Sequence, residues 1–344
     1  MRWTKFSAGT HAGDDPIIDR MVGYMYTPDL MDIPESEIIA HVGTCAILGL
    51  PNVGKSTLLN RLMGLRLMAV SSKPQTTRNR VMGVVNCEVG KGAAQVVFVD
   101  TPGMQEGKGP FRRFMREEAL GAAGNSDVAL LVIDVSHRKQ QDMESLQQSE
   151  ARSMLDALEK FSGPTILALN KVDLLEDKTA LLPILTGFDE TKRFDMLVPI
   201  SAKSGKGTDQ LLQEIAGRFS KGGRLFPEEM YTDKAERFLA AELVREQLFR
   251  QLGDELPYAS AVVIEEFHER DKGDIVISAA IHVERDSQKG IVIGKGGKRI
   301  KAVGERGRKA ISQLFGVPVH LKLFVKVNSN WSQQTKSLRD LGYE

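Results

Sequence analysis

The chain has 344 residues, of which 42% are hydrophobic and 26% charged, and its formal net charge is +1. This composition is ordinary for a globular protein, and the length suffices for two domains that each bury a core. No apolar run approaches ~18 residues, which excludes a helical membrane span. The near-zero net charge does not indicate a polyanion partner, so only a local cluster of charge could indicate one. The two cysteines, Cys45 and Cys87, lie in separate strand-like segments. We expect them to be small buried hydrophobic residues in a reducing compartment rather than a disulfide or metal pair.

Residues 1–43 show no clear hydrophobic period and are predicted to form a loosely ordered N-terminal extension. The segment contains seven acidic and three basic residues. A secretory signal needs an apolar core and a transit peptide needs few acids, so neither fits. The sequence leaves the role of this extension open.

The next segment, Gly49-Leu50-Pro51-Asn52-Val53-Gly54-Lys55-Ser56, has the pattern of a phosphate-binding loop. The apolar residues 44–48 before it predict a buried strand, and residues 57–63 after it have apolar side chains at helical spacing. The two glycines permit backbone angles that let successive N–H groups point at a phosphate chain, and the helix N-terminus adds its positive end. Lys55 is expected to reach the outer phosphates and Ser56 to hold Mg²⁺. The candidate phosphate-binding residues are Gly49, Pro51, Asn52, Val53, Gly54, Lys55, Ser56 and Thr57.

Residues 70–80 are polar, contain Pro74 and lack periodicity, so they are predicted to form a loop. A threonine in this loop would close on Mg²⁺ and a γ-phosphate, ordering the loop only in the triphosphate state. A plain surface loop is the alternative interpretation of the same residues.

Residues 81–89 and 95–99 are predicted to be paired strands, and the second ends at Asp100-Thr101-Pro102-Gly103. An acid at the carboxyl end of a strand beside the phosphate loop is placed to hold the water shell of Mg²⁺, and the Gly103 N–H can approach a γ-phosphate. On its own this tetrapeptide is also typical of an ordinary turn. Its position 45 residues after the loop lysine makes the magnesium interpretation much stronger. Met104 stands where Ras-like enzymes carry a water-orienting glutamine, and a thioether cannot orient water by a strong hydrogen bond. We therefore expect the protein by itself to hydrolyse a bound nucleoside triphosphate slowly.

A strand is predicted at residues 128–135, a long helix at residues 140–161 and another strand at residues 165–169. The last strand ends at Asn170-Lys171-Val172-Asp173, where the Asp173 carboxylate can accept hydrogen bonds from the N1–H and exocyclic amine of guanine. Adenine has no such pair of donors, and a site built for polar groups rejects an analogue lacking them by ~10⁴ or more. The segment therefore favours a guanine nucleotide.

A further strand at residues 197–200 ends at Ser201-Ala202-Lys203, which is expected to support the base with a main-chain N–H and a lysine stem. Strands and helices alternate up to this point, which predicts an α/β domain over residues 44–221, with a mostly parallel sheet covered on both faces. Ligands of such sheets bind beyond the carboxyl ends of the strands, where each of these motifs falls.

A glycine-rich break predicts a linker at residues 222–230, followed by an α+β domain over residues 231–344. The expected elements are a helix at 233–252, an antiparallel strand pair at 260–267 and 274–284, two helices flanking Gly294–Gly297, and a strand from Val319. Helix, Gly-x-x-Gly, helix is the clamp that K-homology (KH) domains use on RNA. Residues 287–309 carry eight basic residues against one acid, which is a local basic patch. The alternative is an ordinary turn beside a solvated helix face; the RNA-binding candidates are Gly294, Lys295, Gly296, Gly297, Lys298 and Arg299.

The ordered motifs resemble those of the translation-factor-related GTPases, with Gln75-Thr76-Thr77-Arg78 added to the segments above. Glu255-Leu256-Pro257-Tyr258, residues 292–297 and residues 318–321 narrow the resemblance to the Era family, over residues 44–344. The resemblance implies a P-loop GTPase domain followed by a type II KH domain, with GTP or GDP and Mg²⁺ as ligands. It also implies GTP hydrolysis that assists assembly of the small ribosomal subunit, and binding near the 3′ end of the small-subunit ribosomal RNA.

The resemblance further assigns individual roles. Lys55, Thr77 and Gly103 would act in hydrolysis, and Ser56, Thr77 and Asp100 would hold Mg²⁺, with Thr76 as the alternative to Thr77. Asn52 matches a family position associated with K⁺ near the phosphates. The family implies a monomer in the bacterial cytoplasm with peripheral contact to the inner membrane, although no residue of this sequence argues for that contact. An organelle matrix is the alternative location.

Three functional hypotheses follow from the residues and the resemblance. The first is a GTP-switched RNA-binding assembly factor in which residues 70–80 and 103–115 bias how the C-terminal domain docks. The second is an RNA chaperone or binding module in which nucleotide hydrolysis is incidental. The third, an ATPase, is disfavoured by Asn170 and Asp173.

Overall fold

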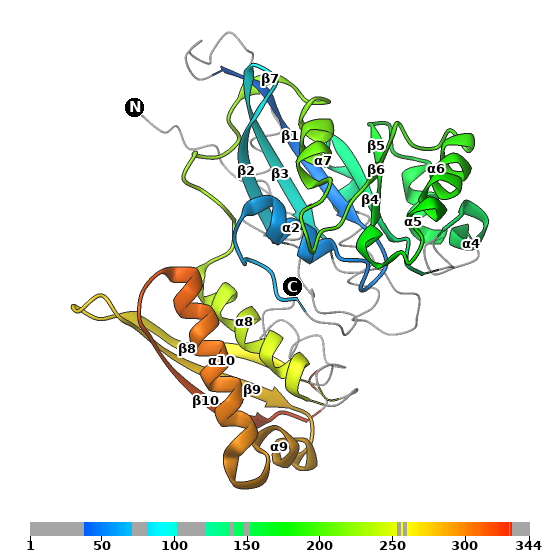
Figure 1. Cartoon of the computed structure of the whole chain (residues 1–344). Coiled ribbons are helices and arrows are strands. Elements are labelled where there is room, and N and C mark those ends of the chain that lie inside the picture. The colour runs from blue at the N-terminus through cyan, green and yellow to red at the C-terminus, as the bar shows by residue number, and fades with distance from the viewer. Residues whose placement is uncertain are drawn as a thin grey trace, which may run out of the picture.

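The computed structural model describes residues 38–70, 81–101, 121–137, 141–147, 152–252, 256, 260–329 and 331. These residues form two bodies, an N-terminal one drawn in blue to green and a C-terminal one in yellow to red (Figure 1). The described strands of the first body form one sheet, in the order β2-β3-β1-β4-β5-β6, and β7 pairs with the remaining stretch of β1. Pairs β1–β3, β1–β4, β4–β5 and β5–β6 are parallel, while β2 and β7 run antiparallel to their partners. The strands are β1 (Ile38–Leu48), β2 (Val81–Val89), β3 (Gly92–Asp100), β4 (Val128–Asp134), β5 (Thr165–Asn170), β6 (Met196–Pro199) and β7 (Ser220–Gly223).

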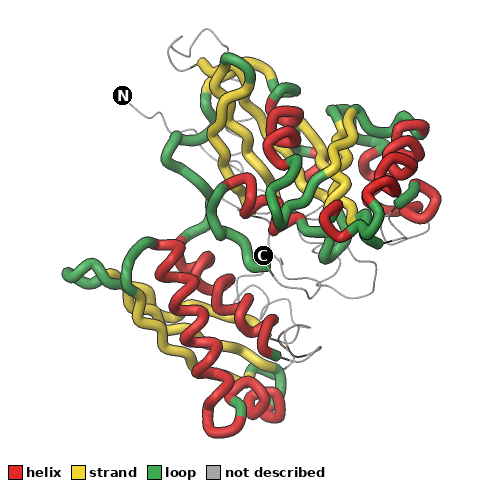
Figure 2. The backbone as a smooth tube through the Cα atoms, viewed as in Figure 1, coloured by secondary structure: helices red, strands yellow, loops and turns green. Residues whose placement is uncertain are grey.

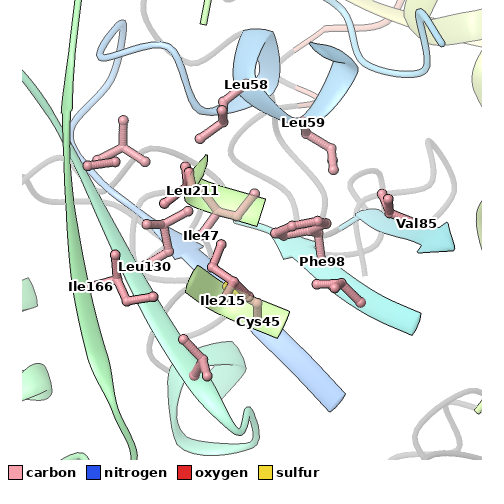
Figure 3. Packing of buried hydrophobic residues seen from close by; sticks show 14 of the residues in the cluster. Cys45, Ile47, Leu58, Leu59, Val85, Phe98, Leu130, Ile166, Leu211 and Ile215 are labelled. Carbon is pink, nitrogen blue, oxygen red and sulfur yellow. The ribbon is translucent and has the colours of Figure 1, made fainter. Parts of the chain in front are cut away.

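Apolar side chains cover both faces of this sheet. Successive residues of a strand point to opposite faces, so Leu130 packs in the cluster under α2 and α7 whereas Leu131 packs in the cluster under α4, α5 and α6. Figure 3 shows the first cluster, in which Leu58 and Leu211 lie over Ile47 and Leu130. The helices are α2 (Lys55–Met63), α4 (Met143–Gln147), α5 (Arg152–Leu158), α6 (Leu181–Glu190) and α7 (Thr208–Ala216), with 3-10 turns η4 (Val172–Leu174) and η5 (Lys178–Ala180).

The second body has three strands in the order β10-β9-β8, with helices packed against one face of this sheet (Figures 1 and 2). Strands β8 and β9 are antiparallel, and β9 and β10 are parallel in one unbroken register from Val319–Ile275 to Val327–Val283. The core joins alternate β9 residues to the buried faces of α8 and α10. The elements are α8 (Glu236–Gln251), β8 (Ser260–Glu269), β9 (Ile275–Val283), α9 (Asp286–Ile293), η6 (Lys295–Gly297), α10 (Lys298–Phe315) and β10 (Val319–Val327).

The connection between the two bodies lies along strand β2. The Val84 N–H donates to the carbonyl oxygen of Tyr231 at 2.9 Å, and the Met82 N–H donates to Asp233 Oδ1 at 3.0 Å. Residue Leu239 of α8 belongs to the core cluster of the first body. The C-terminal body is therefore held to the edge of the sheet by hydrogen bonds from the β2 main chain as well as by apolar packing.

The α/β domain with a mixed, mostly parallel sheet and the α+β domain after it are both confirmed. Strands are present wherever the sequence predicts them, but some boundaries differ. Strand β1 begins at Ile38, inside the predicted extension, and β7 includes residues 222 and 223 of the predicted linker, because these two segments pair with each other. The single helix predicted over residues 140–161 is wrong at its ends: α4 begins at Met143 and α5 ends at Leu158.

Candidate functional site

The predicted motifs meet at the carboxyl edge of the parallel strands. Strand β1 leads into the loop at residues 49–54, β3 ends at Asp100, β5 ends at Asn170, and Ser201 follows β6. Parallel neighbours end at the same edge of a sheet, so these four segments lie together although their positions in the chain are far apart. Gly103, Met104, Pro102 and Thr77 lie outside the described residues.

The loop between β1 and α2 has the glycine geometry that its pattern predicts. Gly49 has φ 153° and Gly54 has φ 105°, both in the region that side chains rarely adopt. A Cβ on Gly49 would lie 2.5 Å from the Val132 carbonyl oxygen, and one on Gly54 would lie 2.3 Å from Asn170 Nδ2. Both glycines are thus required by conformation and by space. Asn52, with φ 64°, also takes a left-handed conformation.

Lys55 begins α2 and turns its amine back over the loop. The side chain is buried, and Nζ donates to the carbonyl oxygens of Gly49 at 2.9 Å and Leu50 at 3.1 Å. Burial lowers the pKa of Lys55 to about 8, and the charge of Asp100 opposes that shift only in part. A buried ammonium held by carbonyl oxygens can exchange them for the oxygens of a phosphate, which would favour its charged form.

Ser56 and Asp100 provide two neighbouring oxygen ligands. The Ser56 hydroxyl donates to Asp100 Oδ2 at 2.9 Å, and the Asp100 carboxylate is buried. Mg²⁺ prefers oxygen ligands and is commonly held by one or two protein groups together with phosphate oxygens and water. Over the described ranges there is no group of three or more His, Cys, Asp and Glu side chains that could hold a metal by themselves. This oxygen pair therefore fits a Mg²⁺ ion that arrives with a phosphate.

The side chain of Asn170 ties the loop to the segment after β6. Its Nδ2 donates to the Val53 carbonyl oxygen at 2.7 Å, and its Oδ1 accepts the Ala202 N–H at 2.9 Å. Asn170 thus holds the Ala202 main chain beside the loop, and support of a base by a main-chain N–H of residues 201–203 stays a prediction. Thr101 makes a similar tie, since its hydroxyl donates to the Ile47 carbonyl oxygen at 2.8 Å.

Arg61 belongs to the site although no sequence motif includes it. From α2 its guanidinium donates to the carbonyl oxygens of Ala202, at 3.4 Å, and Lys203, at 2.6 Å. It thereby fixes the segment after β6 against the helix that follows the phosphate loop. The only signal in the sequence is a basic residue in the last turn of α2, which is too common to identify a role.

The segment after β5 presents Lys171 and Asp173 at the same edge. Lys171 has φ 65°, and its Nζ lies 2.6 Å from Asp134 Oδ2 at the end of β4. Asp173 lies in η4 and is exposed, so its carboxylate is free to accept hydrogen bonds from a ligand. Pro51, Ser56, Thr57 and Lys203 also lie on this edge, in or beside the loops that follow β1 and β6.

The Gly-x-x-Gly segment joins α9 to α10 as predicted. Gly294, Gly296 and Gly297 have φ of 72°, 59° and 71°, and Gly297 caps the N-terminus of α10. A cavity of about 370 Å³ lies beside this loop, lined by Gln251, Gly294, Lys295, Lys298, Arg299 and Arg306. Four of the six lining residues are basic, so the cavity favours an anionic ligand such as a sugar–phosphate chain.

Comparison with known proteins matches each of the two bodies to a known domain family. A family model described as 50S ribosome-binding GTPase matches residues 44–171, and a KH domain model matches residues 255–332. GTPase Era of a Geobacter species is 43% identical over 302 residues, which are 88% of this chain and 97% of that protein. GTPase Era of Xylella fastidiosa is 43% identical over 303 residues, again 88% of this chain and 97% of the relative.

Two solved structures resemble the whole arrangement. A substituted Era of Aquifex aeolicus bound to GDP·AlF4⁻ is 36% identical with a TM-score of 0.79, over 88% of this chain and 99% of that one. Era in complex with MgGDPNP and nucleotides 1506–1542 of 16S ribosomal RNA matches with the same identity, coverage and TM-score. None of the helices in the described part of the chain is both long and apolar enough to cross a membrane. With relatives 43% identical over 88% of its length and matches to both the GTPase and the KH domain models, this chain belongs to the Era family of GTPases.

Proposed function

We propose that this chain binds GTP with Mg²⁺, hydrolyses it slowly, and uses its KH domain to bind small-subunit ribosomal RNA while that subunit is assembled. The observation that carries the proposal is the meeting of Lys55, Asp100 and Asn170 at one sheet edge, in a chain that also presents a basic Gly-x-x-Gly loop. The relative solved with MgGDPNP and 16S ribosomal RNA nucleotides supports this combination of ligands.

In the proposed nucleotide site, the loop N–H groups and Lys55 bind the β- and γ-phosphates. Ser56, Asp100 and Thr77 hold Mg²⁺, which supplies countercharge to the phosphate oxygens. Asp173 accepts hydrogen bonds from the guanine edge. Asn170 holds the phosphate loop beside residues 201–203 through its bonds to Val53 and Ala202.

Hydrolysis is proposed to be slow because Met104 follows Gly103 and offers no strong hydrogen bond to the attacking water. A K⁺ ion near Asn52 would add positive charge beside the phosphates and raise the rate. A turnover of the isolated protein of the order of 1 s⁻¹ or more, without K⁺ or RNA, would contradict this part of the proposal.

In the proposed RNA site, Gly294, Gly296 and Gly297 let the loop approach a sugar–phosphate strand, and Lys295, Lys298 and Arg299 contact its phosphates. The 3′ region of the small-subunit ribosomal RNA is the proposed target. The proposed state is a monomer in the bacterial cytoplasm. Peripheral contact with the inner membrane is also proposed, and flotation with vesicles tests it.

The deciding experiment replaces Gly296 and Gly297 by Asp and measures RNA affinity, GDP affinity and GTP hydrolysis with and without RNA. We expect RNA affinity and RNA-stimulated hydrolysis to fall while GDP affinity is unchanged. The matched control replaces Gly273 and Gly316 by Asp, since both also have positive φ and open space around a Cβ but lie outside the loop. If RNA never changes the hydrolysis rate of the unaltered protein, the alternative function, an RNA chaperone with incidental hydrolysis, is favoured instead.

The base preference has its own test. Asp173→Asn should weaken GTP binding and improve binding of xanthosine triphosphate, because the amide can donate where the carboxylate only accepts. An unchanged preference would remove the proposed role of Asp173.

A further inference from the structure

Asp134, at the carboxyl end of β4, contacts the nucleotide site through Lys171. We propose that Asp134 is a positioning residue that holds the Lys171 side chain in place against the face of the purine base. The inference rests on the proposed function, since it needs a base whose edge is read by Asp173. No motif in the sequence includes Asp134.

The geometry fixes the Asp134 carboxylate from two sides. Its Oδ2 lies 2.6 Å from Lys171 Nζ. Its Oδ1 accepts hydrogen bonds from the Ser136 N–H at 3.0 Å and the Ser136 hydroxyl at 2.6 Å. The backbone is fixed as well, because Asp134 and Asn170 are paired residues of β4 and β5. The carboxylate therefore cannot rotate toward Lys171 or away from it without losing other bonds.

The ion pair determines where the Lys171 stem lies. The amine is held at the end of β4 while the Cα follows β5, so the four-carbon stem spans the edge between these two strands. The side chains of Asp134 and Lys171 are only 13% and 29% exposed, so solvent screens this pair less than a surface pair. A free lysine side chain samples many rotamers, and ordering it on binding costs entropy. Fixing it before the ligand arrives removes part of that cost from binding.

The proposal makes Lys171 an apolar platform. When the guanine edge lies at Asp173, two residues further along, the methylene stem of Lys171 is the apolar surface offered to the ring face. Contact with a ring face does not depend on which groups the base carries at its edge. Asp134 should therefore contribute to affinity for any purine nucleotide, whereas Asp173 selects among them.

The alternative is that Asp134 only closes the turn at Ser136. The variant Asp134→Asn separates the two roles. Its amide oxygen can still accept from the two Ser136 donors, which leaves the NH₂ group facing the Lys171 ammonium and breaks the pair.

The experiment is a double-mutant cycle on the full chain with Asp134→Asn, Lys171→Ala and the double variant, measuring dissociation constants for GDP, IDP and Mg-tripolyphosphate. We expect Asp134→Asn to weaken GDP and IDP alike, by ~3- to 10-fold, and to leave tripolyphosphate binding unchanged. In the Lys171→Ala background the same change should have no further effect. Asp189→Asn is the matched control, since it breaks an Asp–Lys pair of the same 2.6 Å length at the exposed end of α6.

Two results would overturn the inference: an equal loss from Asp134→Asn in the Lys171→Ala background, or a loss for GDP but none for IDP. Each can occur with the unaltered protein binding GDP normally, in which case the proposed function stands. Failure of the unaltered protein to bind GDP would instead refute the proposed function itself. Thermal unfolding of each variant shows whether a loss of affinity reflects a loss of fold.

Discussion

Asn170 donates a hydrogen bond of 2.7 Å from its Nδ2 to the carbonyl oxygen of Val53, a residue 117 positions earlier in the chain. Both atoms are buried, and the other end of the same side chain accepts the Ala202 N–H. One amide therefore couples the phosphate loop to two segments that surround the proposed base.

Asn170→Ala should lower the free energy of unfolding by ~2–4 kcal/mol, because it leaves the Val53 carbonyl oxygen and the Ala202 N–H without their partner. GDP affinity should fall in the same variant, since the phosphate loop is no longer bonded through Asn170 to the segment after β6. Urea unfolding and GDP titration measure the two effects. Asn60→Ala is the control, because Asn60 also makes two hydrogen bonds, to Met68, but none to the site. Equal GDP affinity in the unaltered protein and Asn170→Ala would contradict the coupling.

Gly54→Ala should abolish tight GDP binding. A Cβ at this position would lie 2.3 Å from Asn170 Nδ2, and the φ of 105° is strained for any residue with a side chain. Gly64→Ala is the matched control at the other end of α2, where φ is 65° but no atom lies within 4 Å of the added carbon. The control should lose ~1–2 kcal/mol of stability from backbone strain alone while retaining GDP affinity. Similar affinities for the two variants would show that the space at Gly54 is not needed.

Lys55 should make the stability of the nucleotide-free protein depend on pH. Burial lowers its pKa to about 8 in the folded chain, against an ordinary value of 10.5. Between these pH values the unfolded chain binds more protons, so stability rises as pH increases from about 8 to about 10.5. Below pH 8 the cost of the buried charge is fully present, at ~3 kcal/mol. Lys55→Met should therefore be more stable than the unaltered protein at pH 7 and should lack this rise in urea unfolding; Lys206→Met, at an exposed lysine, should keep it.

The same lysine predicts the pH dependence of binding. Phosphate oxygens favour the charged amine, so GDP binding takes up a proton above pH 8 and affinity should fall by up to about tenfold per pH unit there. Calorimetry in two buffers of different ionisation enthalpy measures the proton uptake. Affinity that is constant from pH 7 to pH 10 would show that Lys55 is already fully charged without nucleotide.

Glu246 should hold the two bodies together. This buried carboxylate of α8 pairs with Arg66, in the segment after α2, and with Arg250 one turn further along α8. Glu246→Gln keeps the shape but removes the charge, and we expect a loss of ~1–3 kcal/mol of stability, with faster proteolysis between residues 224 and 235. Glu159→Gln is the control, since its pair with Arg193 lies within the first body. Unaltered proteolysis in Glu246→Gln would show that apolar packing at Leu239 suffices for docking.

The sequence by itself determined the α/β and α+β architecture, the order of the strands along the chain, and most of the proposed nucleotide-binding residues. These depend on local patterns: glycines that allow positive φ at residues 49 and 54, apolar runs that end at Asp100 and Asn170, and a Gly-x-x-Gly between two helices. Each such pattern constrains the backbone and the chemistry within about ten residues, which is the range over which a sequence can be interpreted directly.

Only the tertiary structure decided what those residues contact. Strand β1 extends back to Ile38 because β7, almost two hundred residues later, pairs with it. The Ala202 N–H donates to Asn170, Arg61 holds the segment after β6, and Asp134 holds Lys171. Each of these contacts joins residues that are distant in the chain and adjacent only once the strands take the order β2-β3-β1-β4-β5-β6. Local spacing cannot encode that adjacency, because it is set by which strand pairs bury the most apolar surface together.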